Sequence, residues 1–190
     1  MSVAIPDYAE PCEGWRLWRF RRVGCQLRLL SLVQETIWPP REELTADCLR
    51  RRLLARLRST RRHEAPAEPC ACGIYATSLD RLATHLRECD DRRTAYVFGR
   101  VHLWGTVIEC QQGWRAARAY PAEIMVPTPP RDYPAGIMAP APGTGASAEE
   151  IADGLGVYAV PLVVLPHHSA EAVEVVASER GLEGRIGSGR

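Results

Sequence analysis

Three cysteines and one histidine lie close together in the first half of the chain. They are Cys48, His63, Cys70 and Cys72, and they fall within 25 residues of sequence. Thiolate sulfur and imidazole nitrogen are the ligands that zinc prefers, and three cysteines with one histidine complete a tetrahedral structural site. The sequence therefore predicts a closed Zn²⁺ site formed by these four side chains.

Two other interpretations of the same residues stay open. One residue separates Cys70 from Cys72, whereas common zinc motifs place about two to four residues between paired cysteines. The cysteines could instead be small, inert core side chains. Alternatively, the protein could be a thiol-dependent enzyme that uses Cys70 or Cys72 beside His63, because nearby cations lower the pKa of a thiol.

An arginine-rich segment follows Cys48. Residues 50–62 contain seven arginines and no acidic residue. Arginines can contact phosphates, and exposed tryptophans can stack on single-stranded bases. The alternatives are a solvated helix face for the arginines and core positions for the tryptophans. We therefore expect a protein or nucleic-acid partner to meet a surface formed by Arg50, Arg51, Arg52, Trp15, Trp18 and Trp38.

Composition is that of a globular protein with a core of ordinary size. The chain has 190 residues, of which 46% are hydrophobic and 25% charged. All 24 basic residues are arginine, and asparagine is also absent, which indicates a GC-rich bacterial genome. The net charge is +6 over residues 1–62 and −5 over residues 132–190. The near-neutral total argues against a strong non-specific nucleic-acid binder.

The cysteine count and the termini predict a reducing compartment. Seven cysteines is an odd number, and residues 1–7 have neither a basic nor an apolar signal region. No run approaches the roughly 18 apolar residues of a membrane span. We expect a cytoplasmic protein with no membrane partner. In that compartment, clustered cysteines are interpreted as metal ligands or reactive thiols in preference to disulfides.

Hydrophobic periodicity predicts an α+β fold. We expect a mixed, mostly antiparallel sheet or small open barrel, with two main helices packed at its edge. The expected strands are a hairpin over 15–37 that turns at Gly24, a short strand at 74–76, a strand over 95–110 and another over 114–126. The expected helices are 41–58, after Pro39 and Pro40, and 78–89. Gly99 and Gly105 predict bulges or close backbone approach within a strand.

Proline and glycine content predicts the domain boundaries. Residues 1–13 form an N-terminal extension and 14–126 the core domain. Six prolines and three glycines make 127–146 a linker. Residues 147–165 form a helix–strand element that docks back on the core, and 166–190 form a flexible tail with at most a marginal helix.

Motifs for catalysis are missing from the sequence. We find no glycine-rich phosphate loop, nucleophile elbow or His-Glu-x-x-His helix. His102 and Glu109 fall on opposite faces of a regular strand, and only a bulge at Gly105 would bring them together. We therefore expect a non-catalytic binding or adaptor module, with the thiol-dependent enzyme as the alternative.

The sequence contains several short motifs, which are Trp38-Pro39-Pro40, Cys48, His63-Glu64-Ala65-Pro66, Cys70-Ala71-Cys72-Gly73-Ile74-Tyr75-Ala76, Gly99-Arg100-Val101-His102-Leu103-Trp104-Gly105 and Gly113-Trp114-Arg115-Ala116. Over residues 14–126 these motifs resemble a group of uncharacterised actinobacterial proteins. That group has no established activity, so the resemblance implies no catalytic residues. Its members carry further Cys-rich segments where this chain has its Pro-rich linker. The order of elements is also faintly similar to that of PUA-like and ASCH barrels, which bind nucleic acid.

Overall fold

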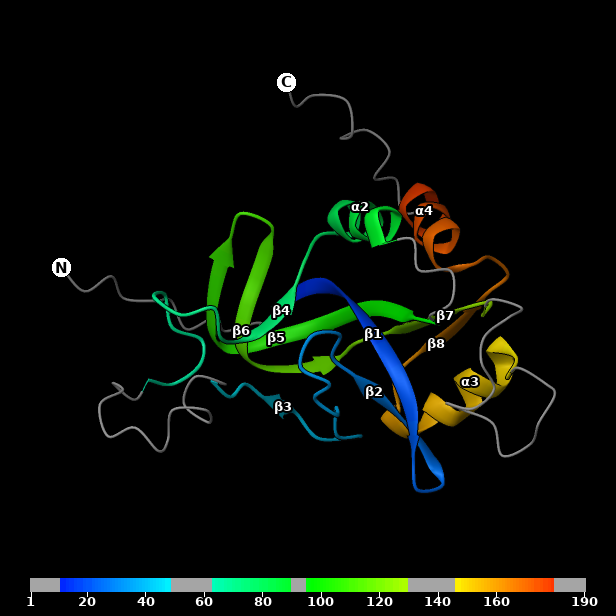
Figure 1. The fold of residues 1–190 in the computed structure, drawn as a ribbon, viewed down its shortest axis with the longest axis horizontal. Coiled ribbons are helices and arrows are strands. Elements are labelled where there is room, and N and C mark those ends of the chain that lie inside the picture. Colours follow the sequence, from blue (N-terminus) through cyan, green and yellow to red (C-terminus); the bar gives the residue numbers. More distant parts are fainter. Residues whose placement is uncertain (1–10, 49–62, 90–94, 130–145, 180–190) are drawn as a thin grey trace.

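A curled, mostly antiparallel sheet forms the centre of the protein (Figure 1). The computed structural model describes residues 11–48, 63–89, 95–129 and 146–179. The main path of the sheet has the strand order β2-β1-β5-β6-β3, while β4 pairs with β6, and β7 with β5 and β8. The strands are β1 (Cys12–Val23), β2 (Gln26–Leu30), β3 (Leu44–Thr45), β4 (Ile74–Ala76), β5 (Val97–Cys110), β6 (Gly113–Pro121), β7 (Ile124–Pro127) and β8 (Leu162–Leu165). The predicted α+β class with an open barrel is confirmed.

Two hairpins with short turns give the sheet its antiparallel character. In the first, Val23 of β1 pairs with Gln26 of β2, and Gly24 adopts a φ of 62° in the turn. In the second, Cys110 of β5 pairs with Gly113 of β6. In the first turn Gly24 takes a left-handed backbone conformation that glycine adopts at little cost. The expected turn at Gly24 is therefore confirmed.

The long strands are buried on both faces, which explains why apolar and polar residues alternate only imperfectly along them. Trp18 and Phe20 of β1 face a core inside the curl, together with Val101 of β5. Leu17 of β1 and Phe98 of β5 face a second core on the outer side. A strand covered on both faces is apolar on consecutive residues instead of alternating.

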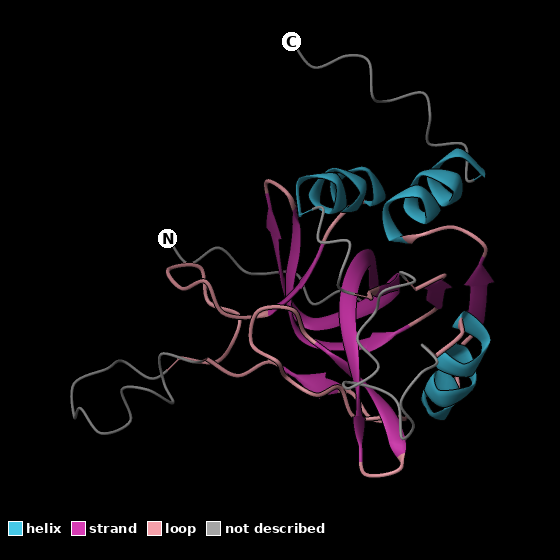
Figure 2. Cartoon of the chain, turned by 45° about the vertical axis from the view of Figure 1, so that its right-hand side comes forward, coloured by secondary structure: helices cyan, strands magenta, loops and turns pink. Residues whose placement is uncertain are grey.

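Among the described residues, three α-helices cover this sheet (Figure 2). α2 (Leu79–Cys89) and α4 (Ser169–Glu179) lie side by side on the outer core. α3 (Ala148–Leu155) packs against the inner core through Ile151 and Leu155. Ser147 begins α3 with a reciprocal capping box to Glu150, which satisfies free amides at the helix start. A 3₁₀ turn, Gly156–Tyr158, then leads toward β8, which pairs in parallel with β7.

Both predicted glycine irregularities occur within β5. The β5–β6 register shifts between Trp104 and Val107, around Gly105 with its φ of 71°. At Gly99 an added Cβ would lie 1.9 Å from the carbonyl oxygen of Glu123. A bulge and a close backbone approach are therefore both present in one strand.

β3 and β4 lie one after the other along the same edge of β6. β5 occupies one edge of β6, while Thr45 pairs with Arg118 and Ile74 with Ala116 on the other. The amide of Ala46, just after β3, donates to the carbonyl of Ala117 of β6 at 2.7 Å. Pairing along this edge then continues in β4, where Ile74 pairs with the neighbouring residue of β6, Ala116. The chain leaves this edge after Ala46 and returns to it at Ile74, so β3 and β4 are two parts of an interrupted edge strand. We call the intervening residues, 47–73, the excursion.

The helix predicted over 41–58 is wrong for residues 41–48, which contain β3. Arg41 has a left-handed φ of 61°, and its amide donates to the Tyr120 hydroxyl. Leu44 pairs with Ala119 and packs on the inner core. Pairing with β6 has therefore overridden the helix start expected after Pro39 and Pro40. The remainder of that prediction, 49–58, lies outside the described residues.

The chain beyond residue 166 is not simply a flexible tail. α4 buries Ala172, Val173 and Val176 in the outer core, which explains why this segment of small apolar residues is helical.

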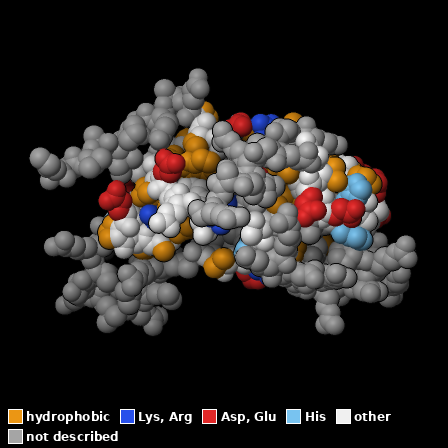
Figure 3. All heavy atoms as spheres, turned by 90° about the horizontal axis from the view of Figure 1, so that it is seen from above, with side chains coloured by type: hydrophobic (Ala, Val, Ile, Leu, Met, Phe, Trp, Pro, Cys, Tyr) orange, Lys and Arg blue, Asp and Glu red, His pale blue; other side chains and the backbone are white. Residues whose placement is uncertain are grey.

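None of the helices in the described ranges is long and apolar enough to cross a membrane. The face seen from above carries several acidic side chains and few basic ones (Figure 3).

Candidate metal centre

The four predicted metal ligands form one cluster. Their ligand atoms all lie within 4.8 Å of one another. The Sγ atoms of Cys48 and Cys70 are 3.7 Å apart, and Cys72 Sγ lies 3.4 Å from His63 Nε2. Cys48 and Cys72 are buried, while Cys70 and His63 are partly buried. The structure therefore brings together every residue of the predicted set.

These separations fit a tetrahedral zinc ion. With Zn–S bonds of about 2.3 Å and a Zn–N bond of about 2.0 Å, two sulfurs of a tetrahedron lie about 3.8 Å apart and a sulfur–nitrogen pair about 3.5 Å apart. The corresponding distances here are 3.7 Å and 3.4 Å. These two separations match those of a tetrahedral site, and the other ligand atoms lie within 4.8 Å of one another.

The interrupted edge strand positions the ligands. Cys48 lies two residues after Ala46, which is hydrogen bonded to β6, and Cys72 lies two residues before Ile74, where pairing with β6 resumes. The two buried cysteines therefore lie at the two ends of the excursion. Because β6 holds both strands, the ends of a long chain segment meet at one place.

Arg115 of β6 holds the backbone of the cysteine loop. Its Nη1 donates to the carbonyl oxygens of Cys70, of Cys72 at 3.2 Å and of Ala67 at 3.4 Å. Its Nε donates to the sulfur of Cys110 at 3.3 Å. The side chain is buried, so water cannot replace these bonds at little cost. We did not predict this residue; a buried arginine in a strand gives no local pattern that separates it from an exposed one.

Gly73 is required where the loop joins β4. It has a φ of 127°, which side-chain-bearing residues rarely adopt. An added Cβ would also lie 3.1 Å from the Cβ atoms of Arg115 and Pro66. The loop therefore lies close against β6 at the point where Cys72 enters the cluster.

Electrostatics disfavour a reactive thiolate at Cys72. Burial raises the pKa of the Cys72 thiol, and a backbone hydrogen bond from Ala67 offsets this only in part. A thiol of raised pKa is a weak nucleophile at neutral pH. A bound metal cation reverses this balance, because a coordinated thiol loses its proton.

The predicted partner surface is only partly tested. Trp18 and Trp38 are 0% exposed and meet edge to face, with ring centroids 5.5 Å apart. Neither can stack on a base, so including them in a partner surface was wrong. Trp15 is partly buried and lies 6.4 Å from the Phe98 ring. Arg50, Arg51 and Arg52 lie outside the described residues.

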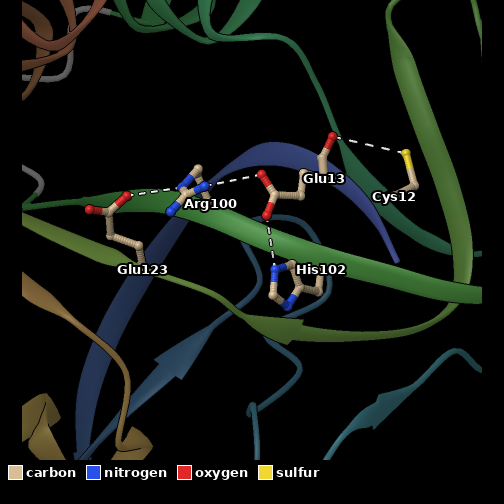
Figure 4. A network of polar contacts seen from close by, with 5 residues as sticks. All are labelled: Cys12, Glu13, Arg100, His102 and Glu123. Atoms are coloured by element: carbon tan, nitrogen blue, oxygen red, sulfur yellow. Dashed lines mark hydrogen bonds and ion pairs between the residues drawn. The ribbon is translucent and has the colours of Figure 1, made fainter. Parts of the chain in front are cut away.

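A second group of titratable side chains lies on the surface of β1 and β5 (Figure 4). Glu13 binds His102 at 3.0 Å and Arg100 at 3.1 Å, and Arg100 also binds Glu123 at 3.0 Å. The His102 hydrogen bond holds the pKa of Glu13 below its usual range. These groups pair with one another, and Glu13 stays ionised as an ion-pair partner. His102, which the strand pattern predicts to be an exposed residue, pairs across the strands with Glu13. The alternation of residues along one strand cannot identify a partner on another strand.

Cys12, which adjoins this network, does not supply a nucleophile. Its thiol contacts the carbonyl oxygen of Glu13 at 3.9 Å. Burial, together with the negative charges of Glu109 and Glu13, raises the pKa of the Cys12 thiol. The network therefore has the character of a surface ion-pair ladder.

No protein-family model, curated protein or solved structure matches this chain. The resemblance to the actinobacterial group and to PUA-like barrels therefore stays a prediction.

Proposed function

We propose that the protein is a non-catalytic binding module whose interrupted edge strand is fastened by a structural zinc ion. The observation that carries the proposal is the convergence of four ligand atoms within 4.8 Å. Thiolate and imidazole ligands select zinc over magnesium or calcium, which take oxygen ligands. Cys48, His63, Cys70 and Cys72 would fill all four positions, so the ion would have no open site for a substrate.

The thiol-dependent enzyme remains a second candidate because Cys72 and His63 are 3.4 Å apart. A sulfur beside an imidazole is the arrangement such enzymes use. The raised pKa and burial of Cys72 oppose it. Thiol-reactivity profiling at neutral pH, with and without a chelator, separates the candidates. Fast labelling of Cys72 in metal-replete protein would favour the enzyme.

Elemental analysis tests the zinc site directly. Protein purified under reducing conditions should contain about one zinc per chain. Cys72→Ser should lose the metal, whereas Cys25→Ser should keep it, because Cys25 is exposed in the β1–β2 turn. Metal-free wild-type protein, or equal zinc content in both variants, would refute the proposal.

For the partner, we propose a protein or a nucleic acid that meets the arginine-rich part of the excursion. Support comes from the sequence alone, since residues 50–62 hold seven arginines and no acid. Titration with single- and double-stranded DNA and RNA tests it. Binding that weakens with salt and with Arg50, Arg51 and Arg52 changed to Ala favours nucleic acid. No binding at moderate salt favours a protein.

A further inference from the structure

A groove of about 1000 Å³ runs beside the interrupted edge strand. One wall is formed by parts of β3 and β4, and the other by the loop after β2. Leu32, Val33, Ile74 and Trp114 are among its apolar lining residues. Val33 is 92% exposed and Tyr75 is 46% exposed. A concave site of this size and character can hold a drug-sized molecule.

Arg16 of β1 supplies a cation to this groove. Its guanidinium lies 5.1 Å from the centre of the Trp38 ring and donates to Ser31 Oγ at 3.0 Å and to the Tyr75 carbonyl. Ser31 Oγ also accepts from Trp38 Nε1 at 3.0 Å, which fixes the orientation of this group. A guanidinium has five N–H donors, and these contacts use two of them. Its Nε is buried with no hydrogen-bond partner among the described residues.

The charge of Arg16 is not neutralised within the described part of the chain. No carboxylate there forms an ion pair with it. Burial lowers the pKa of Arg16 to about 10, so the group stays protonated at neutral pH. The Arg16 side chain is half-buried. A partly buried charge without an opposite charge is costly to desolvate, and an anionic ligand would offset that cost.

The other charged groups facing the groove leave it positive. Arg81 and His85 of α2 line it, and Asp47 is the one acidic residue among the described lining residues. Bidentate recognition of a carboxylate or phosphate is the chemistry that a planar guanidinium provides best. Trp15, Tyr75 and Trp114 add aromatic surface to the same lining.

We propose that this groove binds a small molecule that joins a carboxylate or phosphate monoester to a flat apolar body, with the anion held by Arg16. The ligand would add a small-molecule site to the binding module proposed above. Zinc content measured in the same protein tests the binding module separately, so failure of the groove proposal can be distinguished from failure of the zinc proposal.

Calorimetric titration of the full chain tests the site with three probes of similar shape. They are 2-naphthoate, 2-naphthyl phosphate and the neutral 2-naphthamide. We expect at least one anion to bind with one site per chain and about ten-fold or more tightly than the amide. The tighter anion identifies the ligand class. Equal affinities, or no binding of either anion at millimolar concentration, would overturn the proposal.

Three variants refine the test. Arg16→Gln should remove the preference for the anion while the amide binds as before, and retention of the preference would overturn the proposal. Arg19→Gln is the matched control, since Arg19 lies on the same strand, does not line the groove, and binds the Leu32 carbonyl and Glu35. Thr45→Trp should block all three probes, because exposed Thr45 lines the groove on β3. If Arg16→Gln does not fold, the anion-to-amide comparison in wild type and the Thr45→Trp result still decide the question.

Discussion

Arg115 Nη1 lies 3.2 Å from the carbonyl oxygen of Cys72 and also binds the carbonyls of Cys70 and Ala67. One buried side chain of β6 thus orders the segment that carries two of the four ligands. These hydrogen bonds fix the backbone from which the ligand atoms extend.

Arg115→Met should therefore destabilise the protein and weaken zinc binding. The substitution keeps an unbranched side chain that can fill part of the space but leaves three carbonyl groups without their donor. We expect a loss of about 3 kcal/mol in the free energy of unfolding, measured by urea denaturation. Chelator competition should show a weaker zinc affinity.

Arg118→Met provides the matched control on the same strand. Arg118 is 52% exposed and makes an ion pair of 3.4 Å with Glu43. Exposed pairs of this kind contribute less than about 1 kcal/mol. Equal losses in the two variants would show that Arg115 has no special role in the loop.

Gly73→Ala should also damage the metal centre. Its φ of 127° is strained for alanine, and the added methyl would lie 3.1 Å from Arg115 and Pro66. We expect a loss of at least about 2 kcal/mol, from backbone strain and overpacking together, with reduced zinc content.

Gly24→Ala is the control that separates the effect of backbone strain from the effect of a steric clash. Gly24 has a φ of 62° and no atom within 4 Å of an added Cβ. That variant should lose about 1 kcal/mol and keep its zinc. Full zinc content in Gly73→Ala would contradict the close fit of the loop against β6.

Tyr158 should make stability fall in alkaline solution. Its hydroxyl donates to the Trp38 carbonyl at 2.7 Å and accepts from the Leu29 amide at 2.9 Å, and burial raises the pKa of Tyr158 to about 12. An unfolded tyrosine ionises near a pKa of about 10. The contribution is therefore complete below about pH 10 and is lost as the pH rises toward about 12, by about 2–3 kcal/mol.

Tyr158→Phe should lack this alkaline loss while being less stable at neutral pH by about 2 kcal/mol, because two buried backbone groups lose a partner. Denaturation of both proteins across this pH range measures the difference. Tyr75→Phe is the control, since the Tyr75 hydroxyl bonds Ala71 at 2.8 Å on the surface. A constant difference between wild type and Tyr158→Phe would refute the assignment.

Zinc removal should loosen the edge strand before the rest of the sheet. Binding free energy of a structural metal is folding free energy for the segment it holds. Chelation should increase hydrogen exchange at the Ala46 amide, which bonds Ala117 at 2.7 Å. The amide of Val101, buried in the middle of β5, should stay protected. Equal deprotection at both positions would mean that the metal supports the whole fold.

The sequence was sufficient for features that depend on neighbouring residues. Gly24 predicted its turn, Gly105 its bulge, and the spacing from Leu79 to Leu86 the helix α2. Ligand types alone predicted which four side chains form the candidate metal centre. These features could be predicted because turn conformations, helical periodicity and metal preference are local or chemical properties.

Tertiary structure decided what depends on residues distant in the chain. Leu44 lies in β3 instead of the predicted helix, because it pairs with Ala119 of β6 and packs against the inner core. Trp18 and Trp38 entered the core, Arg115 became a buried cation among carbonyls, and Arg16 became a half-buried cation over the Trp38 ring. An arginine has the same local pattern on a solvated strand and in a buried one. Only the packing of β6 against β3, β4 and the cysteine loop distinguishes the two cases.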